Sequence, residues 1–261
     1  MKVGYLQFHP ERLAVDKNIK RVIQFLESVE AELVVLPELF ATGYLFSSKR
    51  ELLSVAEKFP DGETIKAISD IAKEKDMAIA GGFPEISNNK IFNSQFLVSP
   101  AGEFLYRKVH LFNGEKYLFA PGDTGFVSVE LKGIKIGLMV CFDWLFPEAA
   151  RTLALKGAQV IAHSANLVMP YCQKAMYARA VENRVFTITS NRIGSESVGG
   201  KKLTFTGGSI IYSPTGKILA EGSTDSEEIT IVEIDPTEAL DKNITGDNNI
   251  FDDRRTRLYF R

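Results

Sequence analysis

The chain has 261 residues, of which 45% are hydrophobic and 25% are charged, as is usual for a globular protein. One large α/β domain can hold a chain of this length, so length does not demand two domains. Lys and Arg (31 residues) nearly balance Asp and Glu (33), and the formal net charge is −2. Because nucleic acids and anionic membranes attract basic surfaces, both are excluded as expected partners, and a small neutral or weakly charged ligand is expected instead.

The sequence carries no sign of export or of metal binding. The first residues, MKVGYLQF, read directly as a strand rather than as a signal peptide, and no apolar run is long enough to cross a membrane, so we expect a cytoplasmic protein. Two cysteines, Cys141 and Cys172, are too few for a disulfide framework. The three histidines are not spaced as a metal pair, and we therefore predict no metal site.

The first half predicts strands that alternate with helices. Residues 1–8 form a strand, apolar residues recur at helical spacing over 15–29, and 32–38 is a buried strand that ends at Glu38. A helix over 63–76 and a strand over 77–83 complete a β-α-β-α-β order. Consecutive strands are then expected at 91–99, 104–111, 125–131 and 134–141.

The second half repeats this plan. Strands are expected at 134–142, 158–166 and 184–191, with helices at 147–157 and 171–183 between them, and VSPAGEFL, from Val98, returns as YSPTGKIL, from Tyr212. The ordered matches predict an α/β fold of two sheets with helices outside and pseudo-twofold symmetry, as a single domain over 1–261. The alternative is chance, because strands and turns use few residue types. The segment GSESVGGKKLTFTGG is expected to be the most flexible stretch.

Three polar residues interrupt apolar strands. Glu38 and Cys141 each end a strand, and Lys108 lies within the strand predicted over 104–111. A cysteine attacks as its thiolate, so Lys108 as a nearby cation and Glu38 as a base would make a nucleophile of it, and the N–H of Phe142 would stabilise a developing oxyanion. Each residue also has a structural interpretation: a buried thiol, a helix cap and a solvent-facing lysine.

Three sequence blocks resemble the signatures of the nitrilase superfamily, the carbon–nitrogen hydrolases. They are VVLPELFATGY, YRKVHLFNGEKYLFAPGD and GLMVCFDWLFPEAAR, and they occur in the family's order. The likeness extends over the whole chain and is nearest to the amidase-like and small archaeal-type nitrilase members. It implies a four-layer α-β-β-α sandwich with pseudo-twofold symmetry over residues 1–261, in agreement with the repeat.

The resemblance implies roles for four residues. Glu38 stands where the family has its general base, and Lys108 stands where a lysine stabilises the tetrahedral intermediate. Cys141 matches the nucleophile. Glu115 matches a second glutamate that lies beside the lysine and positions it or the substrate.

Further residues near these motifs are expected to contact substrate. We predict Phe142, Asn166, Trp144 and Tyr44 as substrate-binding residues, and Asp143 as part of the pocket wall. Asn166 has the alternative of tying down a turn, and the aromatic residues that of packing in the core. The histidines His110 and His163 are expected to be hydrogen-bonded core residues, Cys172 to be inert, and Arg179, Glu182 and Asn183 to form a structural network at a helix end.

The chemistry implied is acyl transfer through a thioester acyl-enzyme, without a cofactor. We expect hydrolysis of a small amide, because Cys141-Phe142-Asp143 departs from the Cys-Trp-Glu that nitrile-cleaving branches tend to carry. The alternatives are a nitrilase acting through a thioimidate, an N-carbamoyl amide hydrolase, and a non-catalytic binding member of the fold.

The C-terminal segment 252–261, DDRRTRLYFR, is expected to be an interface tail. In the family this end tends to pack across a two-fold interface. Leu258, Tyr259 and Phe260 would be costly to expose to water, and a homodimer or a higher homo-oligomer is therefore predicted. A solvated basic end is the alternative.

Overall fold

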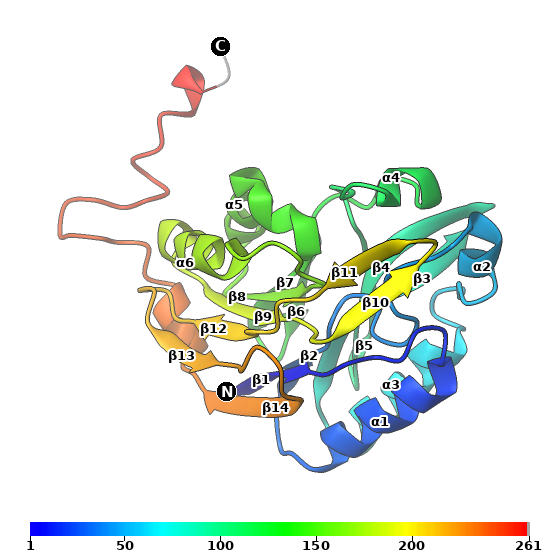
Figure 1. The fold of residues 1–261 in the computed structure, drawn as a ribbon. Helices are drawn as coiled ribbons and strands as arrows, with labels where there is room; N and C mark the ends of the chain where they lie inside the picture. The colour runs from blue at the N-terminus through cyan, green and yellow to red at the C-terminus, as the bar shows by residue number, and fades with distance from the viewer. Residues whose placement is uncertain (260–261) are drawn as a thin grey trace.

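The computed structural model describes residues 1–259, which form two facing six-stranded sheets with helices on their outer sides (Figure 1). The first sheet has the order β14-β1-β2-β3-β4-β5. Its strands are β1 (Lys2–Gln7), β2 (Leu33–Val35), β3 (Ala78–Ser87), β4 (Lys90–Ser99), β5 (Gly102–Arg107) and β14 (Glu228–Glu233). The second sheet has the order β13-β12-β9-β8-β7-β6. Its strands are β6 (Ser128–Leu131), β7 (Ile134–Val140), β8 (Val160–Ser164), β9 (Phe186–Ser190), β12 (Ile210–Tyr212) and β13 (Ile218–Glu221).

The helices complete four layers. The two helices α1 (Val15–Glu27) and α3 (Glu63–Glu74) cover the first sheet, and α5 (Pro147–Leu155) and α6 (Cys172–Asn183) cover the second (Figure 1). The shorter elements are α2 (Lys49–Leu53), α4 (Glu115–Leu118), the 3-10 helices η1 (Cys141–Leu145), η2 (Pro236–Ala239) and η3 (Thr256–Leu258), and the hairpin of β10 (Ser195–Val198) and β11 (Lys201–Thr204). The predicted α-β-β-α sandwich is therefore confirmed.

The pseudo-twofold repeat is visible in the strand order. Parallel strands β1, β2 and β3 are followed by antiparallel β4 and β5, and parallel β7, β8 and β9 are followed by antiparallel β12 and β13. Each sheet gains one antiparallel strand beside the first strand of its repeat, β14 next to β1 and β6 next to β7. The echoes in the sequence therefore reflect a repeated β-α-β-α-β unit rather than chance.

Alternation along the central strands builds the core. In β2, Leu33 and Val35 face the other sheet, whereas Val34 faces the helices that cover the first sheet. Because both faces of such a strand are buried, its sequence is a continuous apolar run. The helices supply one apolar face each, for example Ile19 and Val22 of α1.

Three segments differ from the sequence expectation. The strand expected over 104–111 ends at Arg107, and the strand expected to include Cys141 ends at Val140. Cys141 has a left-handed φ of 39°, which ends the extended conformation and begins η1. The segment read as a loop, GSESVGGKKLTFTGG, contains the β10–β11 hairpin, while its flexibility stays a prediction.

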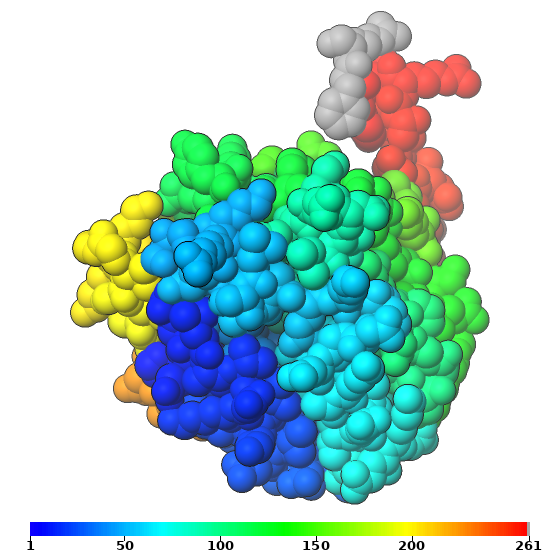
Figure 2. All heavy atoms as spheres, turned by 90° about the vertical axis from the view of Figure 1, so that its right-hand side faces the viewer, coloured from blue at the N-terminus to red at the C-terminus, as the bar shows by residue number. Residues whose placement is uncertain are grey.

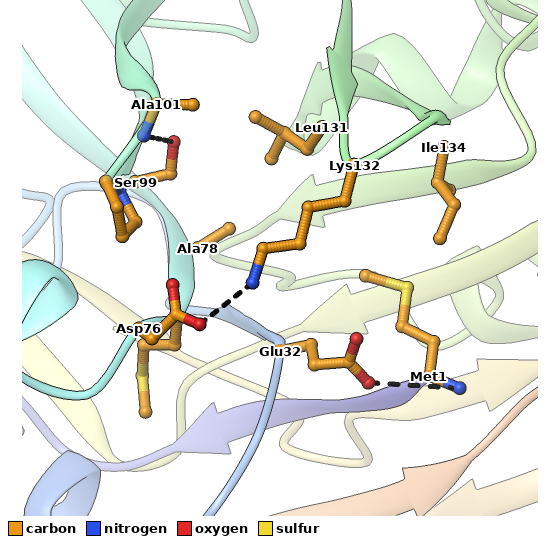
Figure 3. A pocket seen from close by; sticks show the side chains of 11 residues that line it. Met1, Glu32, Asp76, Ala78, Ser99, Ala101, Leu131, Lys132 and Ile134 are labelled. Atoms are coloured by element: carbon orange, nitrogen blue, oxygen red, sulfur yellow. Dashed lines mark hydrogen bonds and ion pairs between the residues drawn. The ribbon is translucent and has the colours of Figure 1, made fainter.

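A cavity opens between the sheets at the end remote from Glu38 and Cys141. It has a volume of about 260 Å³ and is lined by residues of both sheets, including Ala78 and Ile134 (Figure 3). An ion pair between Lys132 and Asp76, 3.0 Å long and exposed to solvent, crosses its rim. The cavity lies at the amino ends of the parallel strands, whereas α/β sheets place their chemistry at the carboxyl ends.

No helix among residues 1–259 combines the length and the apolar character needed to cross a bilayer.

Candidate active site

The carboxyl ends of parallel strands from both sheets converge on one point. Glu38 follows β2 of the first sheet, while Cys141 and Asn166 follow β7 and β8 of the second. The Asn166 side chain donates to the Glu38 carbonyl at 2.8 Å, and the Cys141 Sγ lies 3.8 Å from the Asn166 carbonyl oxygen. These contacts join the two sheets at the place where three strands stop.

A glycine allows Glu38 to lie this close to the neighbouring strand. The Gly82 N–H donates to the Pro37 carbonyl at 3.1 Å, and the Phe40 N–H donates to the Gly82 carbonyl at 3.3 Å. A Cβ at Gly82 would lie 2.6 Å from the Glu38 Cα, which no side chain tolerates. The backbone around Glu38 is therefore held against β3 by contacts that only glycine permits.

Lys108 is buried between two carboxylates. Its Nζ lies 2.7 Å from Glu38 Oε1 and 2.9 Å from the Glu115 carboxylate, and its side chain has no exposed surface. Asn93 donates to the same Glu38 oxygen at 2.7 Å. Within residues 1–259, no hydrogen-bond partner reaches the other Glu38 oxygen, Oε2. Glu38 is thus held by one oxygen, and the second has no hydrogen-bond partner among the described residues.

Glu115 begins α4 and is fixed from three sides. It accepts hydrogen bonds from the Tyr44 hydroxyl at 2.6 Å and from the Phe112 N–H at 3.1 Å, in addition to its contact with Lys108. A buried carboxylate is stable only with such partners. These three contacts hold the Glu115 carboxylate in one orientation beside the Lys108 ammonium.

His163 holds the backbone of Cys141. Its Nε2 lies 3.0 Å from the Cys141 carbonyl oxygen, and its Nδ1 lies 3.1 Å from the Thr189 hydroxyl. Burial lowers the pKa of His163 to about 4, so the ring is neutral at physiological pH. Because a carbonyl only accepts, Nε2 carries the proton and Nδ1 accepts from Thr189.

The buried environment sets the protonation states of the reacting groups. Burial raises the pKa of Glu38 to about 6, although the Lys108 charge opposes the shift. Burial, and then the Glu38 charge, raise the pKa of the Cys141 thiol well above its ordinary value. Burial alone would lower the pKa of Lys108, but Glu115 and Glu38 outweigh it and raise that pKa. At neutral pH the site therefore contains a thiol, a permanent ammonium and a carboxylate that can take up a proton.

A narrow apolar pocket leads from the surface to Cys141. It has a volume of only about 10 Å³ and is lined by Phe112, Cys141, Phe142, Trp144, Asn166, Leu167, Val168 and Met169. None of these lining residues carries a charge. This lining suits a small uncharged group, because it offers no charged side chain to an ammonium or a carboxylate on that group.

The carbon-nitrogen hydrolase family model matches residues 2–240. The chain belongs to the carbon–nitrogen hydrolase family. It is 46% identical to a protein named nitrilase from Pyrococcus abyssi, over 100% of both chains, and 34% identical to an (R)-stereoselective amidase from Pseudomonas sp, over 99% of this chain and 93% of the relative. An amidase structure from Nesterenkonia sp. AN1 matches with a TM-score of 0.79 and 25% identity, covering 99% of this chain and 98% of that chain.

These matches confirm the predicted nitrilase superfamily, and they establish a hydrolase of the amidase or nitrilase type that acts on carbon–nitrogen bonds other than peptide bonds. The structure brings together all four residues that the signature blocks indicated, Glu38, Lys108, Glu115 and Cys141. Their roles in this carbon–nitrogen hydrolase remain a prediction.

The residues predicted to bind substrate occupy two places. Phe142, Trp144 and Asn166 line the pocket beside Cys141. Tyr44 instead contacts Glu115 through its hydroxyl, on the side of Glu115 that also faces Lys108. Tyr44 therefore contacts a charged group of the site and is not among the residues that line the pocket.

Asp143 does not form the pocket wall, contrary to the sequence expectation. Its carboxylate is buried and accepts from the Val140 N–H at 3.1 Å and the Tyr106 hydroxyl at 2.7 Å, and it lies 2.8 Å from His110 Nδ1. The tight η1 turn directs this side chain back toward β7 rather than into the pocket. Asp143 thus fixes the turn that presents Cys141.

The other residues with structural expectations differ in outcome: His110 is only partly buried, and the inertness of Cys172 stays a prediction. His163 is a buried, hydrogen-bonded histidine, and Cys172 is buried. His110 is a quarter exposed and stacks on Phe146, with ring centroids 3.6 Å apart. Arg179 donates to the Trp144 carbonyl at 3.1 Å and so ties α6 to η1.

Sequence reasoning missed several residues that support the site. Asn93 could have been found from the sequence, because a side-chain amide within the apolar strand IFNSQFLVS needs a buried hydrogen-bond partner. In the structure that partner is Glu38. Nothing in the sequence indicated that the pocket includes Leu167, Val168 and Met169, since an apolar run after a strand is typical of the hydrophobic core. Glu196, which binds the backbone beside Tyr44, lies too far away in the sequence to be paired with it.

We predict that Asp143→Asn destabilises the fold by about 1–3 kcal/mol, because an amide replaces a carboxylate that accepts from buried donors. Urea unfolding measures the difference. The matched control is Asp76→Asn, which removes an exposed carboxylate paired with Lys132 and should cost less than about 1 kcal/mol. Equal losses for the two variants would contradict a structural role for Asp143.

Proposed function

We propose that this chain hydrolyses small, uncharged carboxamides to a carboxylic acid and ammonia, with Cys141 as nucleophile, Glu38 as general base and Lys108 as the stabilising cation. One observation carries the proposal. Lys108 and Asn93 hold Glu38 by one oxygen, while the second oxygen is free in a site where burial keeps the neighbouring Cys141 protonated. A base with a free oxygen next to a thiol that must lose its proton is the arrangement that nucleophilic catalysis requires.

In the first step the Cys141 proton moves to Glu38 Oε2 as Sγ forms a bond to the amide carbon. The π electrons of the carbonyl move to its oxygen, and the Lys108 ammonium and the Phe142 N–H stabilise this oxyanion. The oxyanion then reforms the carbonyl and the carbon–nitrogen bond breaks. Glu38 returns its proton to the leaving nitrogen, ammonia departs, and a thioester on Cys141 remains.

In the second step water replaces ammonia. Glu38 takes a proton from water while the oxygen attacks the thioester carbon, giving a second oxyanion beside Lys108. Breaking of the carbon–sulfur bond releases the carboxylic acid, and the proton on Glu38 returns to the Cys141 sulfur. The sum is amide plus water giving acid plus ammonia, and no cofactor or metal is required by this sequence of steps.

The pocket lining supports a small acyl group. Phe142, Trp144, Leu167 and Met169 surround a narrow space of about 10 Å³ without a charged side chain. A charged substrate group would lose its hydration there with no compensating partner. We therefore propose short aliphatic amides as substrates, in preference to N-carbamoyl compounds that carry a charged amine.

A nitrile hydrolase is the second candidate, and the 46% identity to a protein named nitrilase favours it. Attack of Cys141 on a nitrile carbon gives a thioimidate, which two molecules of water convert to the acid and ammonia. The same base and cation serve both reactions. The residues after the nucleophile, Phe142 and Asp143, still favour the amide.

We predict that kcat/KM rises with pH through an apparent pKa of about 6, because burial raises the Glu38 pKa to about 6 and only its carboxylate accepts a proton. Activity is therefore lost as the pH falls below this value. Glu38→Gln should reduce kcat/KM by about 10²- to 10⁴-fold and remove this acid limb from the remaining activity. Initial rates from pH 4.5 to 8 measure both effects.

The control for this experiment is Glu57→Gln. Burial also raises the pKa of Glu57, but its carboxylate binds Thr64 at the start of α3. The Glu57 variant should keep the acid limb. An acid limb that persists in Glu38→Gln would contradict the role of Glu38.

A panel of short amides, the matching nitriles and N-carbamoyl compounds tests the substrate class by ammonia release and intact mass. We expect the amides to turn over fastest, with an added acyl mass that is absent in Cys141→Ala. Cys172→Ala, which removes the other buried thiol, should retain activity. Faster turnover of nitriles selects the second candidate, and equal turnover by Cys141→Ala would contradict covalent catalysis.

We also propose that the active form is a homodimer. Large apolar side chains are exposed over the outer helices of the second sheet, including Leu155 of α5 and Tyr177 of α6. The tail leaves this side of the molecule (Figures 1 and 2), with Leu258 and Tyr259 about half exposed, while Phe260 and Arg261 lie outside the described residues. Burial of such a patch against a second copy removes its contact with water.

We predict that truncation after Asp253 lowers the mass measured by light scattering from dimer to monomer, because the apolar end of the tail is lost. The control is Ile244→Ser, which changes an exposed residue before the tail and should leave the mass unchanged. An unchanged mass after truncation would remove the tail from the interface.

A further inference from the structure

A buried ion pair of the second half of the chain, outside the reacting groups, contacts a loop of the first half. Arg192, which follows β9, has no exposed surface, and its guanidinium contacts the Glu196 carboxylate of β10. The guanidinium also lies over the Phe205 ring, 4.0 Å from its centroid. Figure 2 shows the β10–β11 hairpin, in yellow, beside the blue segment that precedes residue 50.

The Glu196 carboxylate holds the backbone of that segment. It accepts from the N–H of Tyr44 at 3.0 Å and from the N–H of Leu45 at 2.7 Å. Gly43 has a φ of +80°, and a Cβ at this position would lie 2.8 Å from Glu196 Oε1. The loop over 43–45 is therefore shaped to fit this carboxylate.

Tyr44 connects the loop to the reacting groups. Its ring packs edge-on against Phe205, with centroids 6.0 Å apart and an interplanar angle of 84°. Its hydroxyl donates to Glu115 at 2.6 Å, and Glu115 in turn contacts Lys108 at 2.9 Å. A continuous set of contacts thus runs from Arg192 to the Lys108 ammonium.

We propose that Arg192 and Glu196 form a positioning clamp that holds the Tyr44 hydroxyl on Glu115 and, through Glu115, the Lys108 ammonium where the oxyanion develops. This inference rests on the function proposed above. A buried ion pair alone is weak evidence for any role, because its desolvation cost offsets its attraction. Here Glu196 of the pair also accepts from the N–H groups of Tyr44 and Leu45, and the Tyr44 hydroxyl contacts Glu115 in the site.

The position of Lys108 matters because a misplacement of about 1 Å can cost on the order of 100-fold in rate. Without the clamp, Glu115 loses the Tyr44 donor to one of its oxygens and is held only by the Phe112 N–H and by Lys108. Glu38 then shares the ammonium with a less ordered partner. The clamp residues are positioning residues, since neither contacts the pocket beside Cys141.

A double-mutant cycle tests the clamp with Glu196→Gln, Tyr44→Phe and the variant carrying both. We expect each single substitution to lower kcat by about 10- to 100-fold. KM should change by less than about twofold, because the pocket lining is intact. The double variant should be no slower than the slower single variant, because Glu196 acts through the Tyr44 hydroxyl. Effects that multiply in the double variant, or a rate unchanged in Glu196→Gln, would overturn the proposal.

Two further variants keep the result interpretable. Glu227→Gln breaks another Arg–Glu pair, formed with Arg21 at 2.6 Å, and should leave kcat unchanged. Gly43→Ala keeps the Arg192–Glu196 pair but forces the loop away from it, so it should reproduce the loss in kcat even if Glu196→Gln does not fold. Full activity of Gly43→Ala would overturn the clamp.

A second readout separates this inference from the function on which it rests. The rate of Cys141 alkylation by acrylamide, followed by intact mass, reports the state of the site without turnover, and Cys141→Ala gives the background. If the parent protein hydrolyses no amide or nitrile, the proposed function fails. Slower alkylation in Glu196→Gln would still support the clamp, and equal alkylation in the parent and Glu196→Gln would overturn it.

Discussion

The burial of the Lys108 ammonium between two carboxylates is the constraint on which the site depends. A charge removed from water requires partners of opposite sign and hydrogen bonds for every remaining polar atom. Glu38 and Glu115 supply the charge, and Asn93 and Tyr44 supply hydrogen bonds to those carboxylates. Since these partners come from the loop after β2, from β4 and from α4, the ammonium fixes the relative position of three parts of the chain.

The repeated architecture explains why these segments meet. Two β-α-β-α-β units pack sheet against sheet, and strands β2, β7 and β8 end at the same place. At that place the chain departs from extended structure, most clearly at Cys141, whose left-handed φ ends β7. Asp143 and His163 bind the turn on either side. The strained residue is thereby held by a network that also orients its thiol.

The same burial prepares the chemistry. It raises the pKa of both Glu38 and Cys141, so at neutral pH the thiol keeps its proton while Glu38 is a carboxylate that takes up a proton more readily than an exposed one. Lys108 keeps its charge because the two carboxylates outweigh its desolvation. A fixed cation beside a mobile proton suits a reaction in which an oxyanion appears and disappears twice.

The sequence by itself determined the layers, the repeat and the four residues of the site. Apolar runs, helical spacing and three signature blocks are local properties of the sequence. They can be recognised without knowing which residues are in contact. Glu38, Lys108, Glu115 and Cys141 were all identified in this way, and so was the family. The ends of β5 and β7 were predicted too late, because propensity alone does not reveal where pairing or a left-handed φ ends a strand.

Only the tertiary structure decided what surrounds those residues. It directed Asp143 away from the pocket and into the turn, placed Tyr44 on Glu115, and brought Glu196 to a loop about 150 positions earlier in the chain. Hydrogen-bond partners and pocket volume depend on distances between segments that are remote in sequence. A residue type limits what a side chain is able to bind, but the packing of the two sheets decides which group it meets.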